Sequence, residues 1–133
     1  MLCNTFPNFK AIPETWEPKS IEKGWGKELV IINTYKYCMK ILFFKKGSTG
    51  SLHFHKLKDE CWYVWDGQFK LIYTDPETGE RLSESISEGQ IVHLKPCATH
   101  QVVALTDVVI FEGSTEDQIS DSFRIAPGDS QAK

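Results

Sequence analysis

Hydrophobic residues in this chain gather in short runs, which are separated by segments rich in glycine, proline, aspartate and serine. The runs contain many β-branched and aromatic residues, which favour strands, and the segments between them contain residues that favour turns. This pattern predicts strands at 28–33, 35–45, 53–55, 60–65, 69–74, 81–87, 90–94, 100–105 and 107–113. Strands at such regular spacing are typical of an all-β sandwich or barrel. No segment has a long helical period, although 115–123 has room for one helical turn.

The two ends of the chain differ from the middle. Three prolines fall within the first 24 residues, and proline disfavours the helical conformation in the residue before it. The last residues are polar, as is common in frayed termini. We therefore expect an extended N-terminal arm over 1–24, a barrel over 25–125 and a polar, frayed tail over 126–133.

The composition narrows the class of protein. A chain of 133 residues that is 41% hydrophobic and 12% aromatic can bury a core in one domain. The net charge of -3 and the scattered Lys and Arg residues disfavour nucleic-acid binding. No apolar run approaches the roughly 20 residues that span a bilayer, and the N-terminus lacks the apolar core of a secretion signal. We expect a cytoplasmic protein that binds neither nucleic acid nor membrane.

The four cysteines, Cys3, Cys38, Cys61 and Cys97, form no close pair. In a reducing compartment such cysteines are free thiols, buried or partly buried. Cys61 directly follows Glu60, and adjacent residues of a strand point to opposite faces. If Glu60 points into the barrel, Cys61 points out of it.

One motif points to a metal site: Gly47-x5-His53-x-His55-x4-Glu60-x6-Gly67. His53 and His55 are two residues apart, so both face the same side of a strand. Glu60 begins the next predicted strand after a short turn, which lets it fold back toward the histidines. A His-x-His pair alone is often two surface histidines, but the whole motif with its two turn glycines is more specific.

A third histidine completes the candidate site. His100 follows a proline-containing turn and begins a later strand. The predicted metal ligands are therefore His53, His55, Glu60 and His100, a set that suits a divalent transition metal such as Zn, Mn, Fe or Ni. Four protein ligands leave one or two positions of a larger coordination sphere open for substrate. His93 lies outside the motif in the middle of a strand, and we expect it to be structural or exposed.

The motif from Gly47 to Gly67 resembles the first conserved motif of the cupin superfamily at every defined position. The second cupin motif is matched more loosely, because Gly89, Pro96 and His100 fit with altered spacing and Ala98 replaces a glycine. The resemblance implies a cupin double-stranded β-helix, which is a jelly-roll barrel, and this agrees with the all-β prediction.

A narrower resemblance, to the type II phosphomannose isomerase cupin, covers the segments 25–28, 51–67, 89–100 and 112–124. In many bacteria that cupin is the C-terminal domain of mannose-1-phosphate guanylyltransferase. The positions in register with its motif are Ser51, Leu52, His55, Glu60 and Trp62. His53 stands where the family has glutamine, Lys58 where it has arginine, and Arg124 where its tail keeps an arginine. The resemblance implies a sugar or sugar-phosphate ligand and an aldose–ketose isomerisation.

Candidate catalytic and substrate-binding residues follow from this interpretation. Glu60 or Lys40 would carry a proton during isomerisation. Lys58, Tyr73 and Arg124 would bind substrate. From the residues alone, however, we expect Lys40, Lys58 and Arg124 to face solvent. Alternating positions predict that Trp62, Val64, Phe69, Leu71 and Tyr73 face inward, and a buried aromatic is more often part of the core than a substrate platform.

Other functions remain open on the sequence. The chain could be a non-catalytic carbohydrate-binding cupin, or a non-haem iron dioxygenase that uses three histidines and one glutamate. We also expect a homodimer, because cupins of this size commonly pair and the N-terminal arm with Phe6, Phe9 and Trp16 could exchange between subunits. The alternative is that this arm packs on its own barrel.

Overall fold

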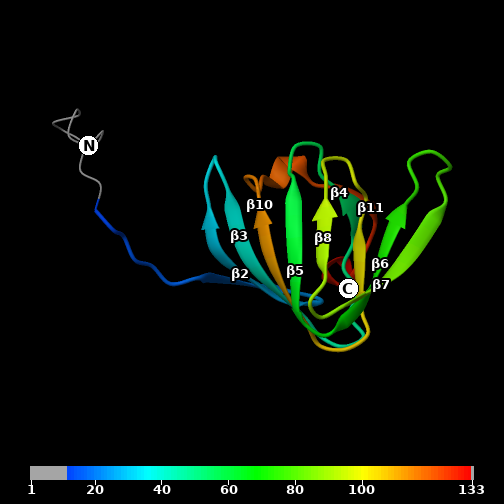
Figure 1. Cartoon of the computed structure of the whole chain (residues 1–133), viewed down its shortest axis with the longest axis horizontal. Coiled ribbons are helices and arrows are strands. Elements are labelled where there is room, and N and C mark those ends of the chain that lie inside the picture. Colours follow the sequence, from blue (N-terminus) through cyan, green and yellow to red (C-terminus); the bar gives the residue numbers. More distant parts are fainter. Residues whose placement is uncertain (1–11, 133) are drawn as a thin grey trace.

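The computed structural model describes residues 12–132, and these form strands joined by turns and two short 3-10 helices (Figure 1). The strands are β1 (Lys19–Lys23), β2 (Gly26–Asn33), β3 (Cys38–Phe44), β4 (Leu52–Phe54), β5 (Glu60–Asp66), β6 (Gln68–Thr74), β7 (Arg81–Ser87), β8 (Ile91–Leu94), β9 (Gln101–Ala104), β10 (Val108–Ser114) and β11 (Phe123–Ala126). The 3-10 helices are η2 (Ile119–Asp121) and η3 (Asp129–Gln131). The all-β prediction is confirmed, and η2 is the helical turn expected within 115–123. None of the described helices is long and apolar enough to cross a membrane.

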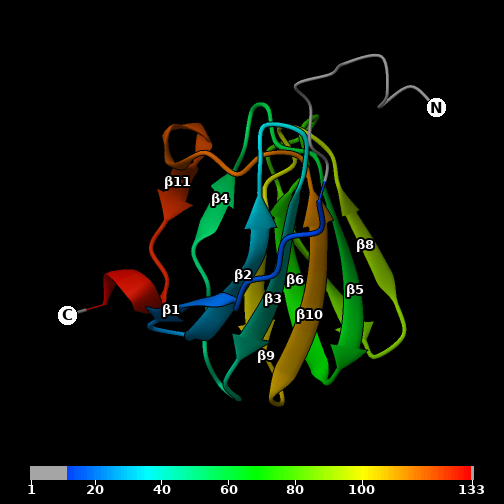
Figure 2. The same ribbon diagram turned by 90° about the vertical axis from the view of Figure 1, so that its left-hand side faces the viewer.

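The strands form two antiparallel layers that face each other as a barrel (Figures 1 and 2). One layer is a six-stranded sheet with the order β1-β2-β3-β10-β5-β8. The other combines a three-stranded sheet, β7-β6-β9, with the pair β11-β4. Isolated bridges between Thr49 and Val103 and between His53 and His100 join β4 and its preceding turn to the β9 segment. The second bridge therefore brings two predicted metal ligands side by side.

The core lies between the two layers. Strands β3 and β5 alternate buried and more exposed residues, as strands with one face toward a core do. Trp62, Val64, Phe69 and Leu71 are buried, as their positions predicted. Tyr73, at the end of the same alternation, is partly exposed. The buried apolar cluster consists of Leu42, Phe44, Trp62, Val64, Phe69, Leu71, Ile86, Val92, Leu94, Val102, Ala104, Val108 and Ile110.

Within the described residues, 19–23 and the segment near the C-terminus are more ordered than the sequence suggested. Residues 12–18 form no strand (Figure 1), but the indole N–H of Trp16 donates to the carbonyl oxygen of Ile31 on β2 at 2.6 Å. Residues 19–23, which were expected in the arm, form β1 and pair with β2. The tail was expected to fray. Instead the tail begins at the last residue of β11, contains η3, and is held by Asp129, which exchanges hydrogen bonds with Thr49 through its backbone N–H (2.8 Å) and its carboxylate (2.7 Å). The prediction for residues 1–11 lies outside the described residues.

The described cysteines are Cys38, Cys61 and Cys97, and all three are free thiols, as predicted. Cys38 is buried, whereas Cys61 and Cys97 are exposed. Glu60 is buried and Cys61 is exposed, which confirms the predicted facing of this pair on β5. Cys3 lies outside the described residues.

Candidate metal centre

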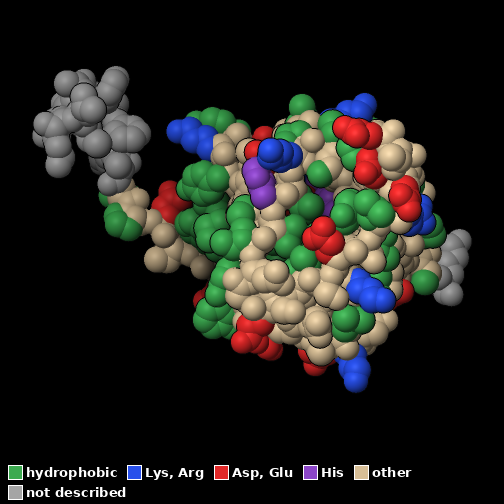
Figure 3. Space-filling model, turned by 45° about the vertical axis from the view of Figure 1, so that its right-hand side comes forward, with side chains coloured by type: hydrophobic (Ala, Val, Ile, Leu, Met, Phe, Trp, Pro, Cys, Tyr) green, Lys and Arg blue, Asp and Glu red, His purple; other side chains and the backbone are tan. Residues whose placement is uncertain are grey.

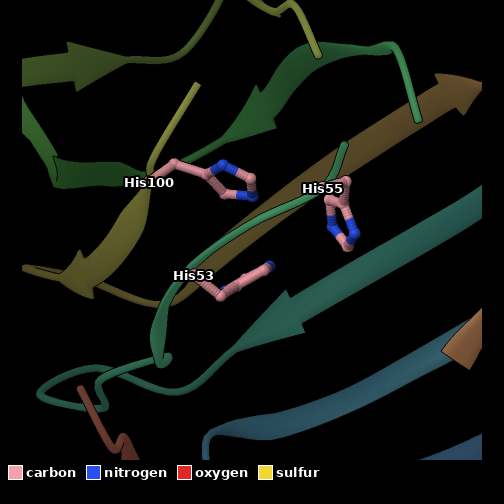
Figure 4. A group of neighbouring side chains, drawn as sticks. All are labelled: His53, His55 and His100. Carbon is pink, nitrogen blue, oxygen red and sulfur yellow. The ribbon is translucent and has the colours of Figure 1, made fainter. Parts of the chain in front are cut away.

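Three histidines meet inside the barrel on the β4–β9 side (Figure 4). His53 lies in β4, His55 directly follows this strand, and His100 directly precedes β9. The backbones of His53 and His100 exchange two hydrogen bonds, of 3.2 and 2.9 Å, which fix these two residues opposite each other. One nitrogen from each of the three rings lies within 4.8 Å of the other two. The structure thus brings together three of the four predicted ligands in one tight group.

The backbone orients all three imidazole rings. The Nδ1 atoms of His53, His55 and His100 lie 3.0, 2.9 and 3.0 Å from the carbonyl oxygens of Ser51, Asp121 and Ala98. A ring nitrogen that faces a carbonyl oxygen is the protonated one, because only an N–H can donate to it. Each Nε2 then keeps its lone pair free. This carbonyl-anchored arrangement is the usual one for histidines that bind metals.

Burial and hydrogen bonding both leave the histidine rings in a form that can coordinate a metal ion. His100 Nε2 is buried and has no hydrogen-bond partner among the described residues, and a buried polar atom without a partner is costly. Burial lowers the pKa of His53 to about 3 and that of His100 to about 4, with further lowering from neighbouring histidines. Both rings are therefore neutral at pH 7, which is the form that coordinates metals. The three histidines fit a divalent transition metal.

Glu60, the fourth predicted ligand, sits at the edge of this group. Its Oε2 lies 3.4 Å from His100 Nε2 and 3.6 Å from His55 Nε2. Its Oε1 lies 3.4 Å from the Nζ of Lys58. The carboxylate is thus shared between the histidines and a lysine, and it falls outside the group whose ligand atoms all lie within 4.8 Å of one another. Its role as a metal ligand stays a prediction.

Lys58 lies at the centre of a buried network of ion pairs. Its Nζ is 2.8 Å from Glu112, 3.2 Å from Asp117 and 3.4 Å from Glu60. The side chain is almost fully buried, so the expectation that it faces solvent was wrong. The physical reason is that three carboxylates offset the cost of burying the ammonium charge of Lys58. Two of them lie more than 50 residues away in sequence.

Lys40 was also expected to face solvent, and it too is buried. It lies on β3 between Cys38 and Leu42, at a position that points into the barrel. Its Nζ donates to Asp117 at 2.7 Å and lies 3.6 Å from Glu28. Lys40 therefore binds one carboxylate oxygen of Asp117, Oδ2, and Lys58 binds the other, Oδ1.

The charges of this network stabilise one another. Burial by itself lowers the pKa of Lys58, but Glu112, Glu60 and Asp117 outweigh it and raise that pKa. In the same way, burial opposes the charge of Lys40, whereas Asp117 and Glu28 raise its pKa. Lys58 and Lys40 in turn lower the pKa of Asp117 to about 2, against the effect of burial. Both lysines therefore hold their protons at pH 7, which disfavours Lys40 as a general base.

A cavity of about 420 Å³ opens beside the histidines. One wall is apolar and includes Trp25, which stacks on Phe44 with ring centres 4.0 Å apart. Lys40, Lys58 and Glu112 lie on the charged side of this cavity. Arg124 on β11 pairs in register with His53 and lines the same cavity, while its side chain is exposed as expected.

Tyr73 and His93 lie apart from the histidine cluster. Tyr73 donates a hydrogen bond from its hydroxyl to Glu84 at 3.1 Å and lines a different cavity, between β6–β7 and β8. The structure does not bring it together with the other predicted site residues. His93 is exposed on β8 and pairs with Asp59 at 2.7 Å, as expected for a residue outside the motif.

Sequence reasoning missed three acidic residues of the site. Glu112 had a signal, since it is a charged residue inside the apolar run 107–113, at an inward position of β10. Asp117 and Asp121 had none. The Asp121 carboxylate accepts hydrogen bonds from the backbone N–H groups of 56–58 at 2.9–3.2 Å, and its carbonyl oxygen orients His55.

Comparison with known proteins supports the fold. No protein-family model and no curated protein matches the sequence. Among solved structures, the capsular polysaccharide assembling protein CapF from Staphylococcus aureus superimposes with a TM-score of 0.71 at 20% identity, over 82% of this chain and 32% of that chain. The same protein with the inhibitor 3-isopropenyl-tropolone gives 0.70 at 20% identity, over 82% and 34%.

Oxalate decarboxylase from Bacillus subtilis, in a study of its Mn(II) centres, superimposes with a TM-score of 0.69 at 18% identity, over 81% of this chain and 30% of that chain. The chain thus spans about a third of the length of these structures. At such identity the likeness shows the fold and leaves the activity open. The chain folds as a cupin double-stranded β-helix, a jelly-roll barrel whose three-histidine cluster is suited to a metal ion.

Proposed function

We propose that this cupin is a metal-dependent protein that binds a sugar or sugar phosphate and interconverts its aldose and ketose forms. The observation that carries the proposal is the convergence of one ring nitrogen from each of three histidines, beside a buried carboxylate and two buried lysines, in one cavity. When bound there, a divalent metal would polarise carbonyl and hydroxyl oxygens and stabilise the negative charge that develops during proton transfer.

Glu60 is the group best placed to move the proton. Aldose–ketose interconversion transfers a proton between two adjacent carbons, and it needs a base that can take up and return that proton. Glu60 lies within 3.6 Å of two of the histidines and faces the cavity. Lys58 holds its Oε1 in place. Lys40, whose pKa is raised, instead holds Asp117 in place and stabilises its negative charge.

The remainder of the cavity suits a carbohydrate. Its volume falls within the roughly 300–1,000 Å³ that is typical of ligand sites. The Trp25–Phe44 wall offers an apolar surface for the C–H groups of a sugar ring, and the amides of Gln101 and Gln118 line the cavity as partners for hydroxyl groups. Arg124 and Lys23 would supply positive charge for a phosphate.

The test begins with metal analysis of the purified protein. The metal-replete protein is then assayed with aldose and ketose phosphates, including mannose 6-phosphate and fructose 6-phosphate. We expect interconversion that a chelator abolishes and that the added metal restores. Glu60→Gln should lose turnover while metal and ligand still bind, and His93→Ala should behave as wild type.

Other results would identify the alternative functions. Bound iron with oxygen consumption, and without sugar turnover, would indicate a dioxygenase. Sugar binding that persists in His55→Ala, without turnover in the wild type, would indicate a non-catalytic carbohydrate-binding cupin. Failure of every sugar phosphate to react or bind, in a metal-replete sample, would overturn the proposal.

A further inference from the structure

A second cavity lies on the open side of the barrel, away from the histidine cluster. Strand β8 is the last strand of the six-stranded sheet and β7 is the last strand of the three-stranded sheet. Both strands are therefore edges, and the two layers separate between them. The β6–β7 hairpin leans away from β8 (Figure 1), and a cavity of about 490 Å³ lies between them. We call it the β7–β8 cavity, and its volume is within the roughly 300–1,000 Å³ of ligand sites.

Apolar side chains form the inner wall of the β7–β8 cavity. Leu71 and Ile86 come from β6 and β7, and Val92 and Leu94 come from β8. All four belong to the buried apolar cluster, so the cavity reaches the core. Figure 3 brings this side of the molecule forward and shows hydrophobic and acidic side chains next to one another near its middle. The wall can therefore shield the apolar part of a ligand from water.

Glu84 brings a charge into this apolar setting. Residues two apart in a strand share a face, so Glu84 lies on the same face of β7 as the buried Ile86. Across the sheet it pairs in register with Leu71 on β6, which is also buried. Glu84 is nevertheless exposed, because the barrel is open at this place. An inward-facing position thus carries a carboxylate that a ligand in the cavity can reach.

The charge of Glu84 is not neutralised within the part of the chain that the structure describes. Lys40, Lys58 and Glu60 point inward too, and each has partners of opposite charge. No ion pair between described residues includes Glu84, and no described lysine or arginine lines the β7–β8 cavity. Its Oε1 accepts a hydrogen bond from the Tyr73 hydroxyl at 3.1 Å, which leaves Oε2 for another donor. The cavity therefore offers a negative charge to a cationic ligand.

We propose that the β7–β8 cavity is a second ligand site, which binds a small organic amine with an apolar body. The ammonium group pairs with Glu84 and lies against the ring of Tyr73, because the face of an aromatic ring attracts a cation. The apolar body packs on the wall that Leu71 and Leu94 share. In the histidine cavity, by contrast, the buried carboxylates already have lysine partners. The site is therefore independent of the proposed isomerase activity.

The first test is isothermal titration of the full chain with 2-phenylethylamine at pH 7. We expect at least tenfold weaker binding of 2-phenylethanol, which lacks the ammonium group, and of ethylamine, which lacks the ring. Glu84→Gln should weaken binding of 2-phenylethylamine at least tenfold. Glu77→Gln is the matched control, because Glu77 is exposed in the turn between β6 and β7 and does not line the cavity. A wild type that does not bind 2-phenylethylamine, or equal weakening by the two variants, would overturn the proposal.

The second test locates the ligand with two exposed cysteines that the chain already carries. Cys97 lines the β7–β8 cavity, whereas Cys61 lies on β5 and does not. Saturating 2-phenylethylamine should slow the alkylation of Cys97 by iodoacetamide severalfold, as followed by peptide mapping, and leave the rate at Cys61 unchanged. An amine that slows neither cysteine, or both equally, would overturn the proposal. Binding that added Zn²⁺ abolishes would place the amine in the histidine cavity and would overturn it as well.

Discussion

The interior of this barrel has two halves with opposite chemistry, built on the same three strands. On β3, β10 and β5 the inward positions beside the histidines carry Lys40, Glu112 and Glu60. Further along the same strands, the inward positions carry Leu42 and Phe44, Ile110 and Val108, and Trp62 and Val64. The alternation is the same in both halves, and only the side chains differ.

The comparison separates what stabilises this fold from what gives it chemistry. The apolar half gains from burial at about 25 cal/mol per Å² of apolar surface removed from water. The charged half must overcome the cost of removing ions from water, and it does so only because each lysine has two or three carboxylate partners. Loss of one ion-pair partner in the charged half should therefore lower the free energy of unfolding more than loss of one methyl group in the apolar half.

The largest expected effect comes from Lys58→Met. Methionine fills a similar space but leaves Glu112, Glu60 and Asp117 without their shared cation in a buried setting. Breaking a buried ion pair by removing one partner typically costs about 3–5 kcal/mol. We expect a loss of this size in the free energy of unfolding, measured by urea titration at pH 7.

A control from the apolar half sharpens the comparison. Ile110→Val, on the same sheet, should cost only about 0.5–1.5 kcal/mol. The double variant Lys58→Met with Glu112→Gln should recover part of the loss, because one unpaired charge is then removed. If Lys58→Met cost no more than Ile110→Val, the charged half would not be the sensitive one.

Acidification should weaken the charged half before the apolar half. The pKa of His53 is lowered to about 3 and that of His100 to about 4, mainly by burial, from an ordinary value near 6.5. Because the unfolded chain takes up these protons first, the stability that these groups contribute is complete above pH 6.5 and is lost as the pH falls toward 4. At about 1.36 kcal/mol per pKa unit, the metal-free protein should lose about 2–4 kcal/mol between pH 7 and pH 5.

Urea titrations of chelator-treated protein at several pH values would measure this loss. The pKa of Asp117, lowered to about 2, acts only below its ordinary value near 3.8. Burial raises the pKa of Glu112, and proton uptake by this group in the folded protein acts against the loss from the histidines. His93→Gln should keep the wild-type dependence, because His93 is exposed on the outside of the sheet. A stability that is flat from pH 7 to pH 5 would contradict the neutral, buried histidine cluster.

The sequence predicted the apolar half better than the charged half, for a physical reason. Alternation of apolar and polar residues is a local signal, so it located most strands and placed Trp62 and Val64 inside. Lys40, in a strand, and Lys58, in the turn before β5, were both expected to face solvent, because a lone lysine normally faces water. Their burial depends on Glu112 and other acidic residues that come close only in the folded chain.

The histidine cluster was predictable because its spacing is itself local. A His-x-His pair on one strand shares a face wherever that strand lies, and the turn glycines fix how the following residues return. What the spacing could not show is how Glu60 divides its two oxygens between Lys58 and the histidines. Strand β1 and strand β11 were missed because their pairing depends on β2 and β4 more than on their own composition.

Removal of one ligand tests the histidine cluster within the charged half. His55→Ala should weaken binding of a divalent metal by about a hundredfold or more, since loss of a residue that merely supports a ligand already costs roughly 10–100-fold. Isothermal titration with Zn²⁺ and Mn²⁺ would measure this. His93→Ala, with its ring outside the barrel, should bind as the wild type does, and equal weakening by both variants would argue against a specific site.

The smallest effect is expected at Tyr73, which belongs to neither half. Its hydroxyl donates to Glu84 near the surface, and its ring borders the cavity between β6–β7 and β8 rather than the one beside the histidines. Tyr73→Phe should therefore change the free energy of unfolding by no more than about 0.5 kcal/mol and leave metal binding unchanged. Arg124, in contrast, lines the histidine cavity. Arg124→Met should leave metal binding unchanged, and it should weaken the binding of a sugar phosphate more than the binding of the unphosphorylated sugar. If Tyr73→Phe weakened sugar-phosphate binding instead, the ligand would occupy the other cavity, and the division of the barrel into a chemical half and a structural half would have to be redrawn.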